Sequence, residues 1–277
     1  MEIKLNKHSF TINPGSNRFF WKKINTIDWE PDSFRVFDYF INSESVVFDI
    51  GSWSGVLSLY AAKTAKKVHA IDPDPVCFRE LCSNINLNPD ICHKIIAYQE
   101  AIYFKEVQMK LHARTTYGAS STSVLQRKRD KVSSFKIKTT TLNKFIETHN
   151  IKQVNFIKID IEGAEFFILP TIKQAIETLQ YPDLYISFHT SFLNEFYYNK
   201  KIPFLLLNKL LMKFEHIFKF PFFKQAIIKD ITSSIESLKH YKYIYQSNGA
   251  LISYNDLKQN PLLIKNNSFV FTNTKWI

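Results

Sequence analysis

The sequence predicts an α/β fold built on a doubly wound, mostly parallel sheet that a C-terminal antiparallel hairpin closes. Short apolar runs, of the length expected for strands buried on both faces, alternate with segments of helical spacing between Val46 and Phe188. Near the C-terminus, the turn sequence Ser247-Asn248-Gly249 separates two further strand-like runs. Such alternation is typical of parallel sheets whose strands are connected by helices.

The expected strands of the main sheet cover residues 46–50, 67–71, 95–98, 155–159 and 184–188, all rich in Val, Ile and Phe. The expected helices between them cover residues 56–66, 75–86, 142–149 and 164–179. Pro75 favours the start of the second helix, whereas Pro170 lies within the last one. Residues 107–113 and 135–140 are expected to add a strand pair around a basic, Ser/Thr-rich loop at 117–131. The closing hairpin is expected at 241–245 and 251–254.

Two parts of the chain are expected to stand apart from this pattern. Residues 1–43 are predicted to be an N-terminal extension with one amphipathic helix near residues 32–41, and residues 44–277 form the main domain. Residues 191–240 are predicted to be a basic, aromatic, helical insertion. Within it, residues 202–224 suit a packed helix or a substrate lid better than a membrane-surface element, although peripheral membrane contact stays an alternative. The lysines in this stretch make it too polar to span a bilayer.

The composition limits the classes of partner and compartment. The chain has 36 Lys and Arg against 25 Asp and Glu, a formal net charge of +11. This balance favours nucleic acid, phosphate-bearing glycans, nucleotide-linked sugars or an anionic membrane, and equally fits a role in solubility alone. Three irregularly spaced cysteines form neither a disulfide framework nor a zinc pattern. With no apolar signal-peptide core at the start of the sequence, a cytoplasmic location is predicted.

Two of the six glycines stand in one strand-to-helix turn, Asp49-Ile50-Gly51-Ser52-Trp53-Ser54-Gly55. The phosphate-binding pattern GxGxxG is absent, which disfavours a dehydrogenase. An acidic strand end suits S-adenosylmethionine, which carries a sulfonium and an ammonium group but no phosphate. Asp72 ends the second strand, where an acid can accept hydrogen bonds from ribose hydroxyls; its alternative role is a helix N-cap. The expected cofactor-binding residues are Asp49, Gly51, Ser52, Gly55, Asp72, Glu100 and Asp160.

At this point the sequence resembles the FkbM family of methyltransferases over about residues 44–190. Four stretches carry the resemblance: VVFDIGSWSGVLSLYAAK, VHAIDPDPVCFRELCSNINLN, TTTLNKF and IKIDIEGAE, the last being the most specific. The resemblance implies a class I, Rossmann-like methyltransferase fold, S-adenosylmethionine as methyl donor, and usually O-methylation of sugar or polyketide hydroxyls. The chain departs from the family at Ser52-Trp53, where Ala-Asn is common, and at Asn143, where an acid is common.

Three residues are the candidates for chemistry: Asp160, Glu162 and His189. The two acids are two positions apart, so continued strand geometry would direct both into one crevice. His189 ends the neighbouring strand, where it could act as general base, or hold a divalent metal such as Mg²⁺ with the two acids. A histidine bonded within a turn is the equally weighted alternative. Glu165 is expected to compensate a helix dipole.

The expected activity is therefore O-methylation of a hydroxyl on a sugar, glycan or related small molecule. A nucleic-acid methyltransferase is less expected, because the fourth strand ends in Asp160-Ile161-Glu162-Gly163 rather than an Asn-Pro-Pro-Tyr type of motif. A non-catalytic scaffold that binds partners through its basic C-terminal region is the other alternative. The basic run at 126–131 would either contact a phosphate-bearing substrate or form a solvated loop. The sequence predicts no particular oligomeric state.

Overall fold

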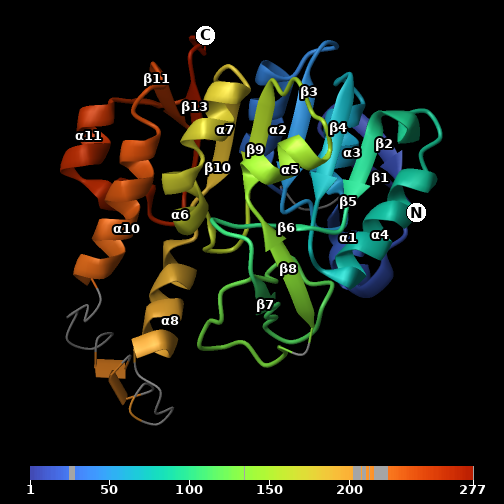
Figure 1. Ribbon diagram of the computed structural model, residues 1–277. Coiled ribbons are helices and arrows are strands. Elements are labelled where there is room, and N and C mark those ends of the chain that lie inside the picture. The colour runs from blue at the N-terminus through green and yellow to red at the C-terminus, as the bar shows by residue number, and fades with distance from the viewer. Residues whose placement is uncertain are drawn as a thin grey trace.

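The structure is a computed structural model that describes residues 1–24, 29–133, 135–201, 207, 210–211, 213–214 and 224–276. Its central sheet contains β3 (Val46–Ile50), β4 (Lys67–Ile71), β5 (Ile95–Tyr98), β9 (Phe156–Ile159), β10 (Asp183–Ser187), β11 (Tyr243–Gln246), β12 (Leu251–Ile252) and β13 (Ser268–Thr272). The spatial order is β12-β11-β13-β10-β9-β3-β4-β5 (Figure 1). The five strands from β10 to β5 pair in parallel, which confirms the predicted doubly wound, mostly parallel architecture.

Helices cover both faces of this sheet, and each face has its own hydrophobic core. The helices are α1 (Arg18–Lys23), α2 (Pro31–Phe40), α3 (Val56–Ala62), α4 (Pro75–Asn86), α5 (Leu142–Thr148), α6 (Glu165–Ile168), α7 (Lys173–Thr178), α8 (Thr190–Lys201), α10 (Lys224–Ser237) and α11 (Tyr254–Gln259). Side chains alternate across each strand, so Val47 packs into the core under α2 and α3, whereas Phe48 packs into the core under α5 and α10. Burial on both faces explains why these strands read as continuous apolar runs.

Two smaller sheets flank the central one. β1 (Glu2–Leu5) and β2 (His8–Thr11) form an N-terminal hairpin, which the sequence analysis did not anticipate. β6 (Ala101–Ile102), β7 (Gln108–Lys110) and β8 (Lys136–Thr140) form a sheet at the carboxyl end of the central strands (Figure 1). β7 and β8 are the expected extra strand pair, and they run antiparallel. The N-terminal segment is packed rather than appended, because Ile3, Phe10 and Trp21 are fully or almost fully buried in the α2–α3 core.

The C-terminal edge differs from the expected hairpin closure. β11 and β12 do pair antiparallel, but β13 lies between β10 and β11 and pairs antiparallel with both. The strand next to β10 is therefore the last one in the sequence, and the β11–β12 pair forms the outer edge. β13 was missed because its run, Ser268–Thr272, follows a polar segment with no turn signal that links it to β11.

The expected helix at 164–179 is wrong as a single element. The structure divides it into α6, a 3₁₀ turn at Leu169–Thr171 and α7. Pro170 has no backbone N–H and its ring obstructs the preceding turn, so an α-helix cannot continue through it. The helices at the two ends of the predicted insertion are α8 and α10. Most of residues 202–223, on which the lid, packed-helix and membrane-surface alternatives depend, lie outside the described residues.

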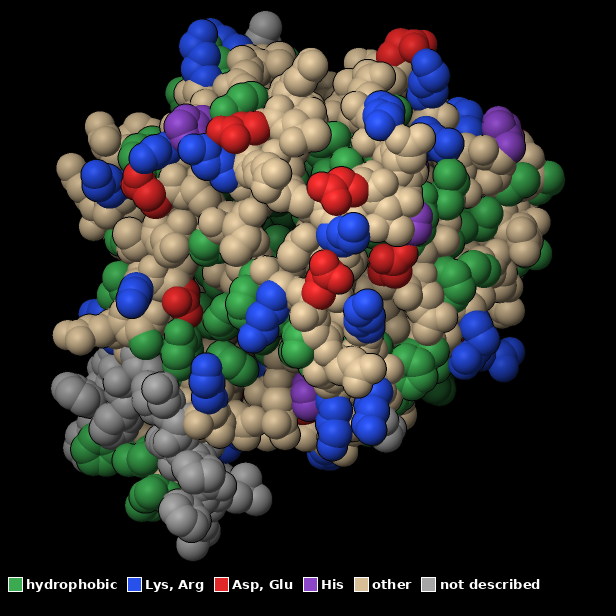
Figure 2. Space-filling model, viewed as in Figure 1, with side chains coloured by type: hydrophobic (Ala, Val, Ile, Leu, Met, Phe, Trp, Pro, Cys, Tyr) green, Lys and Arg blue, Asp and Glu red, His purple; other side chains and the backbone are tan. Residues whose placement is uncertain are grey.

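Basic and acidic side chains are both spread over the face of the molecule seen in Figure 2. Cys77, Cys82 and Cys92 are free thiols. Among the described residues, every helix is too short or too polar to reach across a lipid bilayer.

Candidate active site

The turn after β3 is locked by its own backbone. The N–H groups of Gly51 and Ser52 both donate to the carbonyl oxygen of Ile71, at 2.9 and 3.1 Å. Gly51 has a φ of +82°, and a Cβ atom there would lie 1.8 Å from the carbonyl oxygen of Asp160. Only glycine therefore allows the turn after β3 to approach the end of β9 this closely.

Asp49 and Lys158 form a buried ion pair beneath this turn. Lys158 Nζ lies 2.9 Å from Asp49 Oδ1 and donates to the carbonyl of Gly51 at 2.9 Å, while Ser58 Oγ donates to Asp49 Oδ2 at 2.6 Å. Burial alone would lower the pKa of Lys158, but Asp49 and Asp160 raise it above its usual value. Asp49 does not line the pockets described below. The structure thus gives Asp49 a role in holding the turn, and its expected contact with a cofactor stays a prediction.

A cavity, here called the inner pocket, lies between the ends of β3, β4 and β9. Its lining includes Gly51, Asp72, Glu100, Ile102, Asp160 and Glu162. The Asp72 carboxylate accepts hydrogen bonds from the backbone N–H groups of Trp53 and Asp74, both at 2.9 Å. Burial raises the pKa of Asp72 to about 7. On the far wall, His149 Nε2 lies 2.7 Å from Glu100 Oε1 and fixes that carboxylate.

Asp74, and not Asp72, is the N-cap of α4. Its Oδ1 accepts from the N–H of Val76, and its Oδ2 accepts from Gly118 N–H at 2.8 Å and from Thr122 Oγ1 at 2.9 Å. This one carboxylate therefore fastens the 117–123 loop over the inner pocket. The N-cap alternative considered for Asp72 is wrong, because the neighbouring acid performs that function and leaves Asp72 on the pocket wall.

Trp53 stands where two pockets meet. Its ring stacks on Trp21 with centroids 5.5 Å apart, and its Nε1 donates to the Gly118 carbonyl at 2.9 Å. The second cavity, here called the outer pocket, begins on the other side of this contact and is lined by residues that include Trp29, Glu30, Ser52, Asp160, Glu162 and His189. Ser52 Oγ is buried and has no hydrogen-bond partner in the described part of the chain. Gly55 starts α3 with a φ of +92°.

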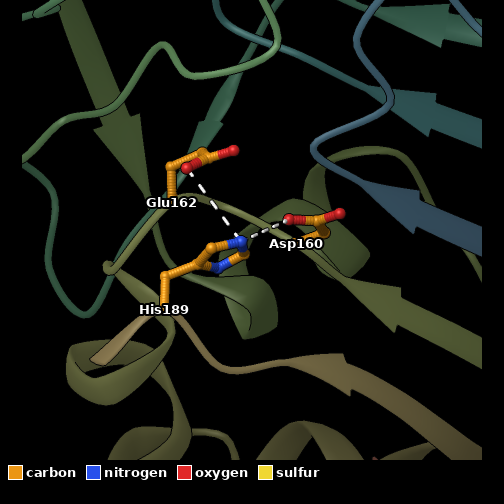
Figure 3. Close-up of side chains that lie close together, drawn as sticks. All are labelled: Asp160, Glu162 and His189. Carbon is orange, nitrogen blue, oxygen red and sulfur yellow. Dashed lines mark ion pairs between the residues drawn. The ribbon is translucent and has the colours of Figure 1, made fainter. Parts of the chain in front are cut away.

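Asp160, Glu162 and His189 converge where the two pockets meet, and we name them the histidine–carboxylate cluster. Their nearest ligating atoms all lie within 4.8 Å of one another. His189 Nε2 is 3.6 Å from Asp160 Oδ1 and 4.0 Å from Glu162 Oε2, so one ring nitrogen faces both carboxylates (Figure 3). β9 ends at Ile159, and Glu162 and Gly163 have φ values of +57° and +99°, so a tight turn rather than continued strand geometry brings Glu162 here.

Glu165 holds His189 from behind. The Glu165 side chain is fully buried. Its Oε1 accepts from the backbone N–H of His189 and lies 3.2 Å from Nδ1, while its Oε2 accepts from Gly163 N–H at 2.8 Å. Glu165 lies in the first turn of α6, as expected for a dipole-compensating carboxylate, and it also bridges the turn after β9 to the end of β10. Occupation of Nδ1 leaves Nε2 to face the cluster.

Arg127 is a buried cation beside Glu162. Its guanidinium donates to both oxygens of Asp130 and to the carbonyl of Ser121, and it lies 4.6 Å over the ring of Phe192, which in turn stacks parallel to His189. Arg127 Nη1 and Glu162 Oε2 are 3.8 Å apart, and each is buried with no hydrogen-bond partner among the described residues. The solvated-loop alternative is therefore wrong for Arg127, although Arg129 is exposed, and contact of the run at 126–131 with a phosphate-bearing substrate stays a prediction.

The surroundings of the histidine–carboxylate cluster raise the pKa values of both Glu162 and His189, so the cluster holds protons more tightly than the same side chains would in water. Burial raises the pKa of Glu162 to about 7, against the opposing effect of His189. Burial would lower the pKa of His189, but Glu165, Asp160 and Glu162 raise it to about 10. Both shifts favour the protonated form: the surrounding carboxylates stabilise the proton on His189, and burial makes Glu162 a weaker acid than an exposed glutamate.

The structure thus brings together most of the predicted site residues. Gly51, Asp72, Glu100, Asp160, Glu162 and His189 line the pockets, as does Ser52. Asp49 and Gly55 support the walls. Sequence reasoning missed the positions of Glu165, Arg127 and Glu30. For Glu165 the signal was present, since a carboxylate two residues after a strand-end turn can bond back to the neighbouring strand; for a buried arginine in a run of basic residues there was none.

A model of the methyltransferase FkbM domain matches residues 45–221, which include the glycine turn, Asp72 and the whole histidine–carboxylate cluster. The chain belongs to the FkbM methyltransferase family. Its central sheet is that of a class I methyltransferase, with a mostly parallel, Rossmann-like arrangement. The family resemblance inferred from four sequence stretches is confirmed over these residues.

Three proteins illustrate what this FkbM family chain is similar to. An uncharacterised protein of Methanocaldococcus jannaschii is 42% identical over 67 residues, which are 24% of this chain and 26% of that protein. The crystal structure of a methyltransferase FkbM from Methylobacillus flagellatus KT is 19% identical, with a TM-score of 0.39, over 53% of this chain and 33% of that chain. A precorrin-6y C5,15-methyltransferase from Geobacter metallireducens GS-15 is 10% identical, with a TM-score of 0.39, over 88% and 87% of the two chains. The chain thus spans about a quarter of the curated relative and a third of the first structure.

Proposed function

We propose that this protein is an S-adenosylmethionine-dependent methyltransferase that methylates a hydroxyl group of a small molecule or glycan. One observation carries the proposal: the histidine–carboxylate cluster lies at the junction of a pocket suited to an adenosine and a second pocket open to an acceptor. Family membership supports a methyl-transfer reaction, and the carboxylate-rich junction favours oxygen as the atom methylated.

The inner pocket fits the cofactor by its chemistry. Asp72 would accept hydrogen bonds from the ribose hydroxyls, and Glu100 would accept from the amino group of the adenine. The glycine at position 51 lets the backbone approach the ligand, since a side chain there would strike Asp160. Asp160 and Glu162 supply negative charge near the sulfonium. Ser52 lines the adjoining outer pocket, toward which the methionine end would extend.

When bound, S-adenosylmethionine supplies a methyl group on a positively charged sulfur, which departs as a neutral thioether as the acceptor oxygen attacks the methyl carbon. The remaining work falls to the protein. Glu162, with a pKa of about 7, is the group we propose to take the hydroxyl proton. His189, protonated and fixed by Glu165, would donate a hydrogen bond that orients Asp160 or the acceptor oxygen. Alignment of the two reactants provides the rest of the rate enhancement.

The same cluster fits a divalent cation such as Mg²⁺ or Mn²⁺. Asp160 and Glu162 offer carboxylate oxygens, and His189 offers Nε2 because Glu165 occupies Nδ1. A bound cation would lower the pKa of a coordinated hydroxyl and replace the proton on His189. Dialysis against EDTA, followed by addition of Mg²⁺ or Mn²⁺ during a methyl-transfer assay, distinguishes a mechanism that needs a cation from one in which Glu162 takes the proton without it. Full activity in EDTA would leave the proton-acceptor role to Glu162 alone.

Calorimetric titration with S-adenosylmethionine and S-adenosylhomocysteine tests the proposal directly. We expect both to bind, and Asp72→Ala to weaken both. Glu162→Gln and His189→Ala should leave S-adenosylhomocysteine binding intact and remove most methyl transfer from labelled donor to a pool of hydroxyl acceptors. Folded wild-type protein that binds neither ligand would contradict the proposal and favour the non-catalytic scaffold.

A further inference from the structure

A third hollow continues from the outer pocket on the side away from the adenosine site. We name it the serine-rich pocket. Its lining includes Glu30, Ser33, Tyr185, Ser187, Asn266 and Ser268. It shares Glu30, Asp160 and His189 with the outer pocket. A molecule seated in it therefore meets two members of the histidine–carboxylate cluster.

The walls of this pocket come from segments that do not form the cofactor turn. Glu30 and Ser33 belong to the N-terminal segment at the start of α2, Ser187 ends β10, and Ser268 begins β13. Because β13 runs antiparallel to β10, Ser268 pairs with Ser187, and their Oγ atoms lie 3.0 Å apart. The late strand β13 thus supplies one wall of the pocket.

A chain of hydrogen bonds fixes Glu30 at the boundary between the two pockets. Ser33 Oγ donates to Glu30 Oε2 at 2.9 Å and lies 2.8 Å from the hydroxyl of Tyr185 on β10. Glu30 also has a left-handed backbone, with φ of 48°, at the N-cap position of α2. The carboxylate is therefore held in place rather than free to swing into solvent.

The pocket is polar, and the one basic side chain in its described lining, His189, already faces the carboxylates of Asp160, Glu162 and Glu165. No Lys or Arg lies among its described lining residues, whereas Glu30, Asp32 and Asp160 do. In the outer pocket, Lys158 Nζ is occupied by Asp49 and Gly51. A phosphate or carboxylate placed here would lose water, would lie beside these carboxylates, and would have to compete with them for His189. The excess of basic over acidic side chains that gives the whole chain its net charge of +11 is therefore not found in the lining of this pocket.

We propose that the serine-rich pocket is the acceptor subsite, that it takes a neutral, polyhydroxylated ring, and that Glu30 is a specificity-determining residue that rejects anionic acceptors. This inference rests on the proposed function. Serine hydroxyls and asparagine amides both donate and accept hydrogen bonds, so they can pair with ring hydroxyls that act as donors and with ring hydroxyls that act as acceptors. Fixed carboxylates beside the reacting oxygen accept from hydroxyl groups and repel phosphates and uronates.

The experiment uses the full-length chain loaded with S-adenosylhomocysteine. Saturation-transfer NMR measures binding of a panel of methyl hexosides, together with the matched uronates and 6-phosphates, and labelled methyl transfer is measured on the same compounds. We expect the neutral members to bind at least about tenfold more tightly than their anionic partners. Glu30→Lys should reverse or abolish that preference while S-adenosylhomocysteine affinity stays within about twofold. Glu44→Gln, a change at a side chain that is 79% exposed and outside these pockets, is the matched control.

The outcomes separate the two proposals. Binding of S-adenosylhomocysteine without binding of any neutral glycoside, or with tighter binding of the phosphates, overturns the acceptor subsite and leaves the proposed function standing. Methylation of an oligonucleotide in place of the glycosides does the same. An unchanged preference in Glu30→Lys removes Glu30 from specificity. Failure of the wild-type protein to bind S-adenosylhomocysteine contradicts the proposed function itself.

Discussion

Glu165 Oε1 lies 3.2 Å from Nδ1 of His189 and also accepts the backbone N–H of the same residue. One buried carboxylate therefore fixes both the position and the ring orientation of the histidine. A histidine held in this way presents its other nitrogen in a single direction, which is the usual arrangement where imidazole acts on a ligand or a metal.

Glu165→Gln should lower methyl transfer roughly 10- to 100-fold and leave S-adenosylhomocysteine affinity unchanged. Glu165 is the largest influence that raises the pKa of His189, so the value of about 10 should fall toward the ordinary 6.5. Two-dimensional NMR titration of the imidazole measures that shift. Glu147→Gln, at a side chain that is 66% exposed, controls for the change in charge. A His189 pKa that stays in place would contradict the contact.

Cofactor affinity should rise with pH through the pKa of Asp72. Burial raises that pKa from 3.8 to about 7, and hydrogen bonds from ribose hydroxyls favour the ionised carboxylate. Between pH 6 and pH 8 the ionised fraction grows about tenfold, so the S-adenosylhomocysteine Kd should fall by a similar factor. Asp72→Asn should bind weakly with little pH dependence. If the S-adenosylhomocysteine Kd of the wild type and of Asp72→Asn changed with pH in the same way, Asp72 would not be the group that binds the cofactor.

The same group should make the folded protein less stable as pH rises. Between pH 3.8 and about 7 the folded state holds the Asp72 proton and the unfolded chain has released it. The unfolding free energy contributed by this group therefore falls with increasing pH across that window. Urea unfolding of wild type and Asp72→Asn at pH 5 and pH 7.5 isolates the effect, which should appear as a smaller pH-dependent loss in the variant.

Arg127→Met should destabilise the fold by about 3 to 5 kcal/mol, because it removes the nearest cation from the buried carboxylate of Asp130, which keeps the backbone N–H of residue 127 and the more distant Arg114 at 3.9 Å. Arg129→Met, two positions away at a side chain that is 74% exposed, should change stability by no more than about 0.5 kcal/mol. Chemical denaturation of the pair measures the difference. Equal stabilities would mean that the interior position of Arg127 is wrong.

Gly51→Ala and Gly249→Ala form a matched pair. Both glycines have a positive φ, of +82° and +90°, so each substitution carries a backbone strain of about 1 to 2 kcal/mol. At position 249 the new Cβ has no neighbour nearer than 3.8 Å, whereas at position 51 it would lie 1.8 Å from Asp160 oxygen. Gly51→Ala should therefore be the less stable protein and should lose S-adenosylhomocysteine binding, which Gly249→Ala retains. Intact binding in Gly51→Ala would contradict the contact.

The parts of the fold that the sequence predicted correctly are those governed by local rules. β4, β5 and α4 have the predicted bounds, because a doubly buried strand and a helix begun at Pro75 both carry their signals within a few residues. The same local rules predict that a helix breaks at Pro170, but the apolar residues around it have helical spacing, and the prediction of one helix at 164–179 followed that spacing. β13 depends on pairing with β10, about 80 residues earlier in the sequence, and no local pattern encodes such a partner.

The site divides in the same way. Gly51 and Asp72 were predicted because glycine and acid at strand ends have few other uses, and Asp160, Glu162 and His189 because parallel strands end at one edge. The roles of Glu165, Arg127 and Glu30 depend on contacts between distant segments. Arg127 belongs to a run of charged residues that is typical of a solvated loop, and although Asp130 lies three residues away, only the fold places Phe192 over the guanidinium and buries the pair.

The walls of the site come from separable lengths of the chain. The turn after β3, the end of β4 and the end of β9 surround the inner pocket, whereas the segment before α2 and the start of β13 surround the serine-rich pocket. Substitutions in the second set leave the Gly51–Asp160 contact untouched. If the proposed roles of the pockets are correct, such a scaffold can change its acceptor by substitutions at the pocket-lining residues of its two terminal segments, while the residues proposed to bind the methyl donor stay the same.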